Sequence, residues 1–116
     1  MHKPTKDESA KILGKQPQER EFYFYRATEE PIGTSANSLT EFVDTIKTLE
    51  AASLEFHMSR GDFEKWVAML GDETLSQQIV NIRRDALHGD KMRKRLLQIS
   101  RLRLGQLRKL ADEPTI

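Results

Sequence analysis

The sequence contains no cysteine among its 116 residues, which excludes disulfide bonds and metal sites built on thiolates. It also has no uninterrupted run of about 18 apolar residues, the length that a membrane-spanning helix requires. Its first residues, MHKPTKDESAKIL, lack the apolar stretch of a secretion signal. From these absences we expect a cytoplasmic protein that has no membrane partner.

Catalytic and cofactor-binding motifs are missing as well. The three histidines are widely scattered, no H-x-x-x-H pair occurs, and there is no glycine-rich phosphate loop. His57 precedes Asp62 by five residues and could act as a general base with a carboxylate partner. One histidine beside one aspartate falls short of an active site, and a buried structural histidine is the simpler interpretation. We expect a binding protein that is not an enzyme and has no cofactor, metal ion or small-molecule substrate.

Hydrophobic residues are also scarce, at 37%, whereas charged residues reach 32%. This composition is typical of a small helical protein with charged helix faces, and the length fits one domain. The net charge of +1 hides an asymmetry. Residues 1–82 carry 9 Lys+Arg and 14 Asp+Glu, a net charge of −5, and residues 83–116 carry 10 and 4, a net charge of +6. Such a split indicates an anionic partner or head-to-tail self-association.

Four consecutive aromatic residues, from Phe22 to Tyr25, predict a strand because aromatic side chains favour strands and the run is too short for a helix. A turn at Glu29-Glu30-Pro31 would return the chain as a hairpin over residues 21–36. The aromatic side chains are expected to form core and rim. Alternatively, they could provide a surface on which nucleobases stack.

Helical spacing of apolar residues dominates the rest of the chain. Ser38 and Glu41 match a capping box at the start of a helix over residues 39–50. In the pairs Gly61-Asp62 and Gly71-Asp72, glycine would end one helix and aspartate would cap the next. Ser53 and Asp90 are expected to cap two other helices. The further helices are predicted at residues 51–59, 63–70, 72–84 and 91–111, with Trp66 near the centre of the core.

The predicted fold is therefore mainly α, a compact bundle of four to five helices with a small N-terminal β-hairpin and a long basic C-terminal helix. Residues 1–20 would be a flexible segment with a short helical turn that Gly14 ends. Residues 21–88 would form the helical core domain with the hairpin. Residues 89–116 would be the long helix and a tail, with Pro114 marking the end of the helix.

The last helix carries the sharpest functional signal. Lys94, Arg101 and Arg108 recur every seven residues and so form a basic stripe, which could follow the phosphates of a nucleic acid. RNA or the ribosome is the leading partner, and DNA is less expected. The candidate nucleic-acid-binding residues are Arg83, Arg84, Lys91, Arg93, Lys94, Arg95, Arg101, Arg103, Arg108 and Lys109.

The same helix also permits a protein partner. Its apolar face could form a homodimer or an adaptor contact through Leu96, Ile99, Leu107 and Leu110. Arg93 and Arg103 intrude near this face, so the heptad pattern is imperfect. A plainly solvated basic face is the third alternative.

The segment Ser53-Leu54-Glu55-Phe56-His57, followed by Arg60-Gly61-Asp62-Phe63-Glu64-Lys65-Trp66, resembles a family of small, uncharacterised, mostly archaeal proteins known as a domain of unknown function. The similarity covers about residues 10–82. It implies a small helical domain without an established catalytic activity, and it supplies no functional residues. Members of that family end in a long charged helix that is often more acidic, so the basic stretch 91–109 is the departure.

Overall fold

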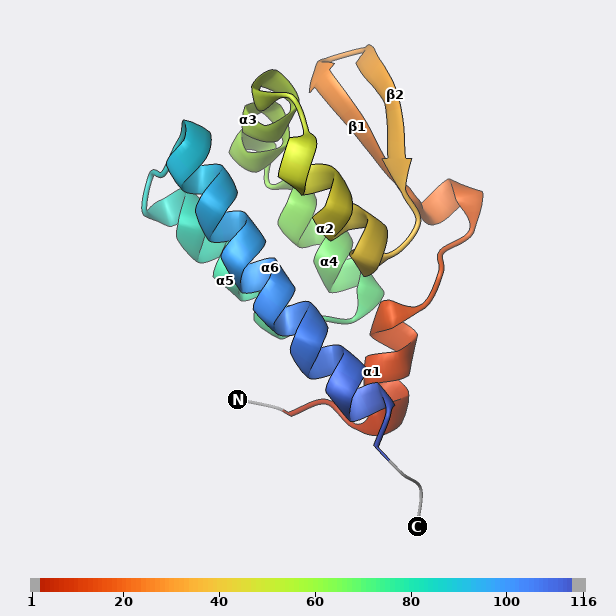
Figure 1. Cartoon of the computed structure of the whole chain (residues 1–116). Helices are drawn as coiled ribbons and strands as arrows, with labels where there is room; N and C mark the ends of the chain where they lie inside the picture. The colour runs from red at the N-terminus through yellow and green to blue at the C-terminus, as the bar shows by residue number, and fades with distance from the viewer. Residues whose placement is uncertain (1–2, 114–116) are drawn as a thin grey trace.

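Six α-helices, one short 3-10 helix and two strands make up residues 3–113, the part of the chain that this computed structural model describes (Figure 1). This order confirms a mainly helical fold with an N-terminal hairpin and a long C-terminal helix, but it corrects the expected four to five helices to six. The elements are α1 (Lys6–Leu13), η1 (Gln18–Arg20), β1 (Phe22–Ala27), β2 (Glu30–Ala36), α2 (Leu39–Thr48), α3 (Ala51–Arg60), α4 (Asp62–Leu70), α5 (Glu73–Arg84) and α6 (Gly89–Ala111).

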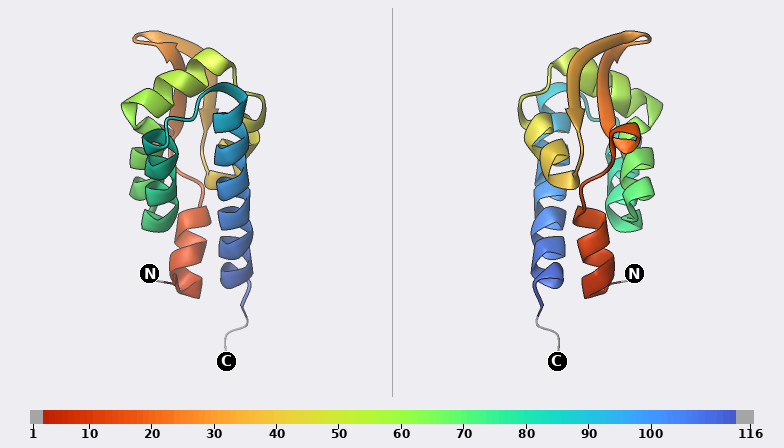
Figure 2. Two further views of the ribbon diagram at one scale, coloured as in Figure 1. Left: turned by 90° about the vertical axis from the view of Figure 1, so that its left-hand side faces the viewer. Right: turned by 90° about the vertical axis from the view of Figure 1, so that its right-hand side faces the viewer.

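The additional helix is α1, for which the sequence suggested only a turn before Gly14. Thr5 and Glu8 close a reciprocal capping box, since the Thr5 hydroxyl accepts from the Glu8 amide and the Glu8 carboxylate accepts from the Thr5 amide. Ser9 and Ile12 are buried as α1 packs beside the end of α6 (Figures 1 and 2). Residues 1–2 of the expected flexible segment, and Pro114, lie outside the described residues.

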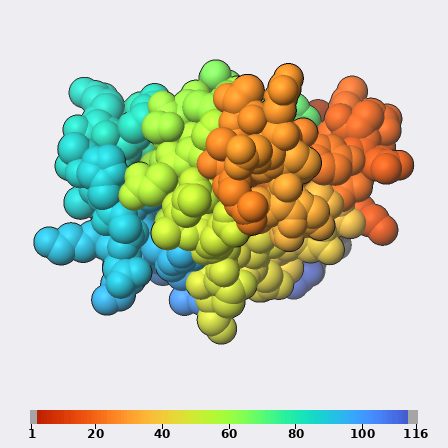
Figure 3. All heavy atoms as spheres, turned by 90° about the horizontal axis from the view of Figure 1, so that it is seen from above, coloured from red at the N-terminus to blue at the C-terminus, as the bar shows by residue number. Residues whose placement is uncertain are grey.

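The hairpin is confirmed, with β1 and β2 antiparallel and Phe22 opposite Ala36. Phe22 and Phe24 are buried, Tyr25 is half-buried and Tyr23 is exposed, so the aromatic run alternates between core and surface. A two-stranded hairpin is marginal alone. This one rests on α3 through β1 and on α2 through β2, and it lies beside α3 when the molecule is seen from above (Figure 3).

The core fills the space between the hairpin, α2, α4, α5 and the inner face of α6. Its centre holds buried aromatic rings, with the Phe63 ring 5.2 Å from those of Phe22 and Phe42. Trp66 lies at the edge of this cluster, where its indole N–H donates to the Arg20 carbonyl at 2.9 Å. The tryptophan therefore holds the segment that leads into the hairpin against α4.

Two of the predicted helix caps are confirmed. The Ser38 hydroxyl accepts from the Glu41 amide, although the Glu41 carboxylate accepts from the amide of Asn37 and not from that of Ser38. Asp72 caps α5 by accepting from the Leu75 amide at 3.1 Å.

The other three predicted caps are wrong. Ser53 lies inside the first turn of α3, because the helix already begins at Ala51. Asp62 is the first residue of α4, and its carboxylate is used by His57 and Arg60. His88 occupies the N-cap position of α6, so Asp90 falls in the first turn, where its charge still complements the helix dipole.

Gly61 is the only residue between α3 and α4, and its conformation permits the chain to turn sharply there. Its φ of 76° is a left-handed conformation that strongly favours glycine, and it serves both as the C-cap of α3 and as the N-cap of α4. A Cβ atom there would lie 2.7 Å from the Arg83 guanidinium. The sharp turn places the end of α3 and the start of α4 beside the hairpin.

Replacing Phe63 with alanine should lower the free energy of unfolding by about 3–5 kcal/mol, because it removes a fully buried ring from the centre of the core. Met69, on the same helix, is 43% exposed, so Met69→Ala should change stability by only about 0.5 kcal/mol. Urea denaturation followed by circular dichroism measures both. Equal losses for the two variants would contradict this assignment of the core.

Candidate nucleic-acid interface

The long helix α6 turns its apolar side into the domain. Met92, Leu96 and Leu107 are fully buried and Ile99 is nearly so, in contact with a core that α1, α2 and α5 share. Three of the four residues predicted for a dimer or partner contact, Leu96, Ile99 and Leu107, are therefore occupied inside the monomer, and Leu110 is half-buried. A second chain could reach Leu96, Ile99 and Leu107 only if α6 separated from the rest of the domain.

Arg103 is also turned inward. Its Nε and Nη2 atoms donate to both carboxylate oxygens of Asp72, at 2.9 and 3.0 Å, and both side chains are almost completely buried. Because Asp72 also caps α5, one carboxylate joins the start of α5 to the middle of α6. Arg103, predicted to bind nucleic acid, is thus a structural residue whose charge is already neutralised.

Arg93 and Arg83 also hold the fold together. The Arg93 guanidinium donates to the carbonyl groups of Ile46, at 2.6 Å, and Leu49, at 2.5 Å, which are among the last acceptors of α2. Arg83 pairs with the buried carboxylate of Glu64. Arg93 is half-buried and committed to these carbonyl groups, whereas Arg83 is paired with Glu64 but keeps a side chain that is 38% exposed.

The remaining predicted cations point outward. One lies at the end of α5 and six lie on α6, and no acidic residue interrupts α6 between Asp90 and Asp112. Arg95 and Arg108 make only exposed hydrogen bonds to the uncharged side chains of Gln98 and Thr40. Besides Arg83, which pairs with Glu64, the exposed candidates are Arg84, Lys91, Lys94, Arg95, Arg101, Arg108 and Lys109. We call the six on α6 the basic face.

The basic face also contains Leu102, which is 63% exposed. Gly105 follows one helical turn later, and a Cβ atom there would meet no other atom within 4 Å. The packing of the monomer requires no glycine at this position, where a mid-helix glycine carries a modest cost. Both features are compatible with a surface against which a partner packs closely.

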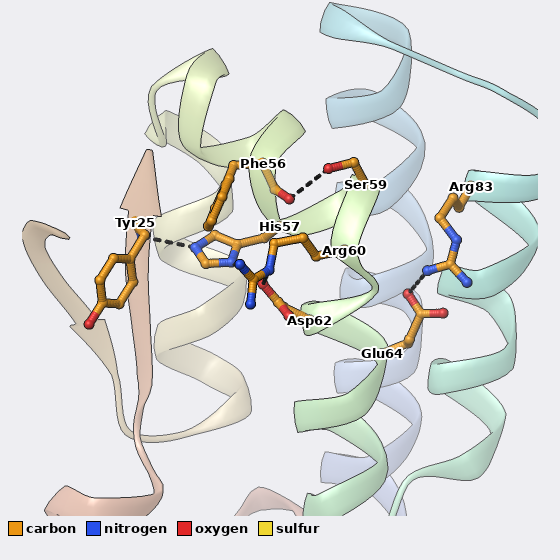
Figure 4. Close-up of polar contacts among 8 residues, drawn as sticks. All are labelled: Tyr25, Phe56, His57, Ser59, Arg60, Asp62, Glu64 and Arg83. Atoms are coloured by element: carbon orange, nitrogen blue, oxygen red, sulfur yellow. Dashed lines mark hydrogen bonds and ion pairs between the residues drawn. The ribbon is translucent and has the colours of Figure 1, made fainter. Parts of the chain in front are cut away.

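His57 is buried between the hairpin and α4, with both ring nitrogens in use (Figure 4). The backbone N–H of Tyr25 donates to Nε2 at 2.8 Å, so the ring proton sits on Nδ1 and is donated to the Asp62 carboxylate, also at 2.8 Å. Burial lowers the pKa of His57, and the nearby Asp62 carboxylate only partly offsets that effect. A general base needs a free lone pair, and here the Tyr25 amide occupies it.

Other kinds of site find no support in the described part of the chain. Residues 3–113 contain no group of three or more His, Asp or Glu side chains placed to hold a metal ion. Nor does any helix in that range have the length and apolar character needed to cross a membrane.

A family model described as "Family of unknown function (DUF5752)" matches residues 4–101 of the chain. The chain belongs to this family. The match begins before α1 and ends within α6, so it spans the hairpin, the core and most of the long helix. No curated protein and no solved structure matches the chain.

The contacts of Arg103 were not predicted from the sequence, although the spacing of the residues around it indicates that it is buried. Arg103 lies four residues after Ile99 and four before Leu107, which places it on the buried face of α6. An arginine at such a position needs a buried acceptor, and Asp72 is that acceptor. The bond from the Tyr25 amide to His57 had no comparable signal, because it joins residues 32 positions apart through a backbone group.

Replacing Arg103 with methionine should lower the free energy of unfolding by about 3–5 kcal/mol, because it leaves the buried Asp72 carboxylate without its partner. The double variant Asp72→Asn/Arg103→Met should recover much of this loss, since asparagine can still cap α5 and carries no charge. Urea denaturation of the four proteins gives the coupling energy. Additive losses in the double variant would mean that the ion pair does not act as a unit.

The stability of the fold should fall as the pH drops below about 6.5, the ordinary pKa of histidine. The pKa of His57 is lowered in the folded state, so between that lowered value and 6.5 the unfolded chain binds more protons than the folded chain. Protonation of Nε2 would also break the bond from the Tyr25 amide. Melting temperatures between pH 8 and pH 5 measure the effect. His57→Gln should flatten the profile, and a profile that keeps its full slope in this variant would contradict the assignment to His57.

Proposed function

We propose that this protein is a cytoplasmic, non-enzymatic binding protein that associates with RNA, in free form or within the ribosome, through the basic face of α6. The observation that carries the proposal is the division of its cations. Arg83, Arg93 and Arg103 satisfy groups inside the fold, whereas six cations on α6 face solvent with no acidic residue among them on that helix. A surface of this kind is attracted to a chain of phosphates.

The dimensions of the basic face suit an extended anionic polymer. Lys91 and Lys109 are 18 residues apart, which at about 1.5 Å per residue is about 27 Å along the helix axis. Lys94, Arg101 and Arg108 repeat at intervals of about 10 Å on this scale. Since α1, α2 and α5 pack against the other side of α6, the helix can lie along a phosphate backbone but cannot be surrounded by a groove.

The basic face also disfavours the homodimer that the leucine pattern suggested. Pairing two copies through this face would oppose six cations with six cations, and like charges in contact are destabilising. The leucines that would have to drive the association lie in the core of each monomer. An acidic protein partner remains an alternative occupant of the same face, which the experiment below distinguishes from RNA.

The triple charge reversal Lys94→Glu/Arg101→Glu/Arg108→Glu should abolish RNA binding. Fluorescence anisotropy with a labelled single-stranded RNA at low salt measures the affinity. For the wild-type protein, log K should fall with log salt with a slope of roughly −2 to −4, if three to six phosphates are contacted. The proposal is wrong if the wild-type protein binds neither RNA nor ribosomes at low salt.

A matched control separates the basic face from net charge. The triple variant Lys15→Glu/Arg20→Glu/Lys65→Glu changes the net charge by the same amount at exposed positions outside α6. It should bind RNA with an affinity within a few-fold of the wild type. Equal losses in the two triple variants would indicate non-specific attraction, and binding of an acidic peptide in preference to RNA would favour the adaptor role.

A further inference from the structure

A second surface, unconnected with α6, is a cleft of about 450 Å³ between the hairpin, α3 and the start of α4 (Figure 4). Its walls combine aromatic rings with charged groups. Tyr25 on β1 lies across from Phe56 and His57 on α3, and Asp62 closes the lower side. Trp66, the only tryptophan of the chain, also lines the cleft. The cleft is therefore shaped by the segment from Phe56 to Trp66 that carries the family resemblance.

One guanidinium group already lies in this cleft. The Arg60 side chain places its guanidinium carbon 4.9 Å from the centre of the Phe56 ring and its Nε atom 3.2 Å from the Asp62 carboxylate. This is the combination of an aromatic face and a carboxylate that binds a planar cation. The position of Arg60 indicates that the walls of the cleft can accommodate a guanidinium group.

The charge of the cleft leaves room for a second cation. Glu21, Glu29 and Asp62 line it together with Arg60, which gives a net charge of −2. His57 adds no charge, because its two ring nitrogens serve as one donor and one acceptor. Tyr25 also lines the cleft, and its half-buried ring points away from the Phe56–Arg60 stack (Figure 4). An incoming cation would meet the Tyr25 ring, the Glu29 carboxylate and the Glu21 carboxylate, of which one oxygen accepts from the Ser35 hydroxyl at 2.9 Å.

Glu29 supplies an independent observation. It stands at the hairpin turn with a φ of 61°, a left-handed conformation that is uncommon for a residue other than glycine. Its side chain is exposed, and no described residue forms a hydrogen bond or ion pair with its carboxylate. The fold would be better served by glycine at this position. Glu29 is thus a strained residue that makes no packing contribution but places a carboxylate at the rim of the cleft. This combination suggests that its carboxylate binds a ligand.

We propose that the cleft binds an arginine side chain of a protein or peptide partner. The guanidinium group stacks on Tyr25, and its N–H groups donate to the carboxylates of Glu21 and Glu29. Arginine fits better than lysine, because the planar guanidinium both stacks on a ring and presents a fork of donors to carboxylates. This site goes beyond the RNA-binding face and does not depend on it.

The test titrates the full chain with a capped pentapeptide, Gly-Arg-Gly-Arg-Gly, that contains no aromatic residue. The fluorescence of Trp66 and its single indole N–H resonance report on the cleft directly. We expect a saturable change with the arginine peptide, a response at least five-fold weaker with the lysine peptide, and none with the citrulline peptide, whose side chain has a similar shape but no charge. Equal responses to arginine and citrulline, or no saturable change at millimolar peptide, would overturn the proposal.

Protein variants separate the cleft from the rest of the molecule. Glu29→Gly should raise the melting temperature, because it relieves the left-handed conformation, and should still weaken binding of the arginine peptide at least three-fold. Glu21→Gln/Glu29→Gln should weaken it at least ten-fold. The matched control Asp44→Asn/Glu73→Gln removes the same charge at exposed positions outside the cleft and should bind as the wild type does. Equal weakening by both double variants would reduce the effect to general charge attraction.

The charge-reversed α6 variant, Lys94→Glu/Arg101→Glu/Arg108→Glu, distinguishes failure of this proposal from failure of the RNA proposal. It should lose RNA binding while its affinity for the arginine peptide stays the same or increases. If it loses the peptide as well, although its circular dichroism spectrum matches that of the wild type, the cleft is not an independent site.

Discussion

The buried ion pair between Asp72 and Arg103 fixes the relation between the two halves of this protein. A charged pair without access to water is stable only when its hydrogen bonds are complete, and here both carboxylate oxygens and two guanidinium nitrogens are used. The same carboxylate caps α5, so the rotation of α6 about its own axis is tied to the start of α5. That rotation turns the leucines inward and the remaining cations outward, and the basic face depends on it.

The opposite half of the molecule is organised around a neutral polar bridge. His57 joins the Tyr25 backbone on β1 to Asp62 at the start of α4, and Asp62 in turn holds Arg60 beside Phe56. The two contacts with Asp62 cross the single-residue turn at Gly61, which brings the start of α4 back to the end of α3. The bridge holds the hairpin against the helices and shapes the acidic, aromatic cleft. Surfaces of opposite charge therefore arise from separate polar networks in one small domain.

Periodicity in the sequence predicted the helices and the hairpin well, because apolar residues at regular spacing decide which faces are buried. It failed where contacts depend on distant partners. Asp62 does not cap α4 as predicted, because its carboxylate bonds to His57 and Arg60. The helix α1 looked like a turn because Thr5 and Glu8 carry a capping signal without a long apolar stripe behind it. On α6, counting every cation made the candidate site too large. Arg93 and Arg103 are basic residues like the others, but their guanidinium groups bond to groups inside the fold. Their position next to the apolar residues of α6 is what distinguishes these two arginines from the exposed cations of the basic face.

The contacts of His57 bear on the kind of function that this domain can have. A histidine that acts as a general acid or base must exchange protons with a substrate, yet both nitrogens here are committed to internal partners and the ring is buried. The imidazole of His57, in the segment that carries the family resemblance, therefore serves to hold the hairpin in place. What remains accessible is charge and aromatic surface, on the helix at one side and in the cleft at the other. Groups of that kind are suited to recognising a partner, which is the role that we propose for both surfaces.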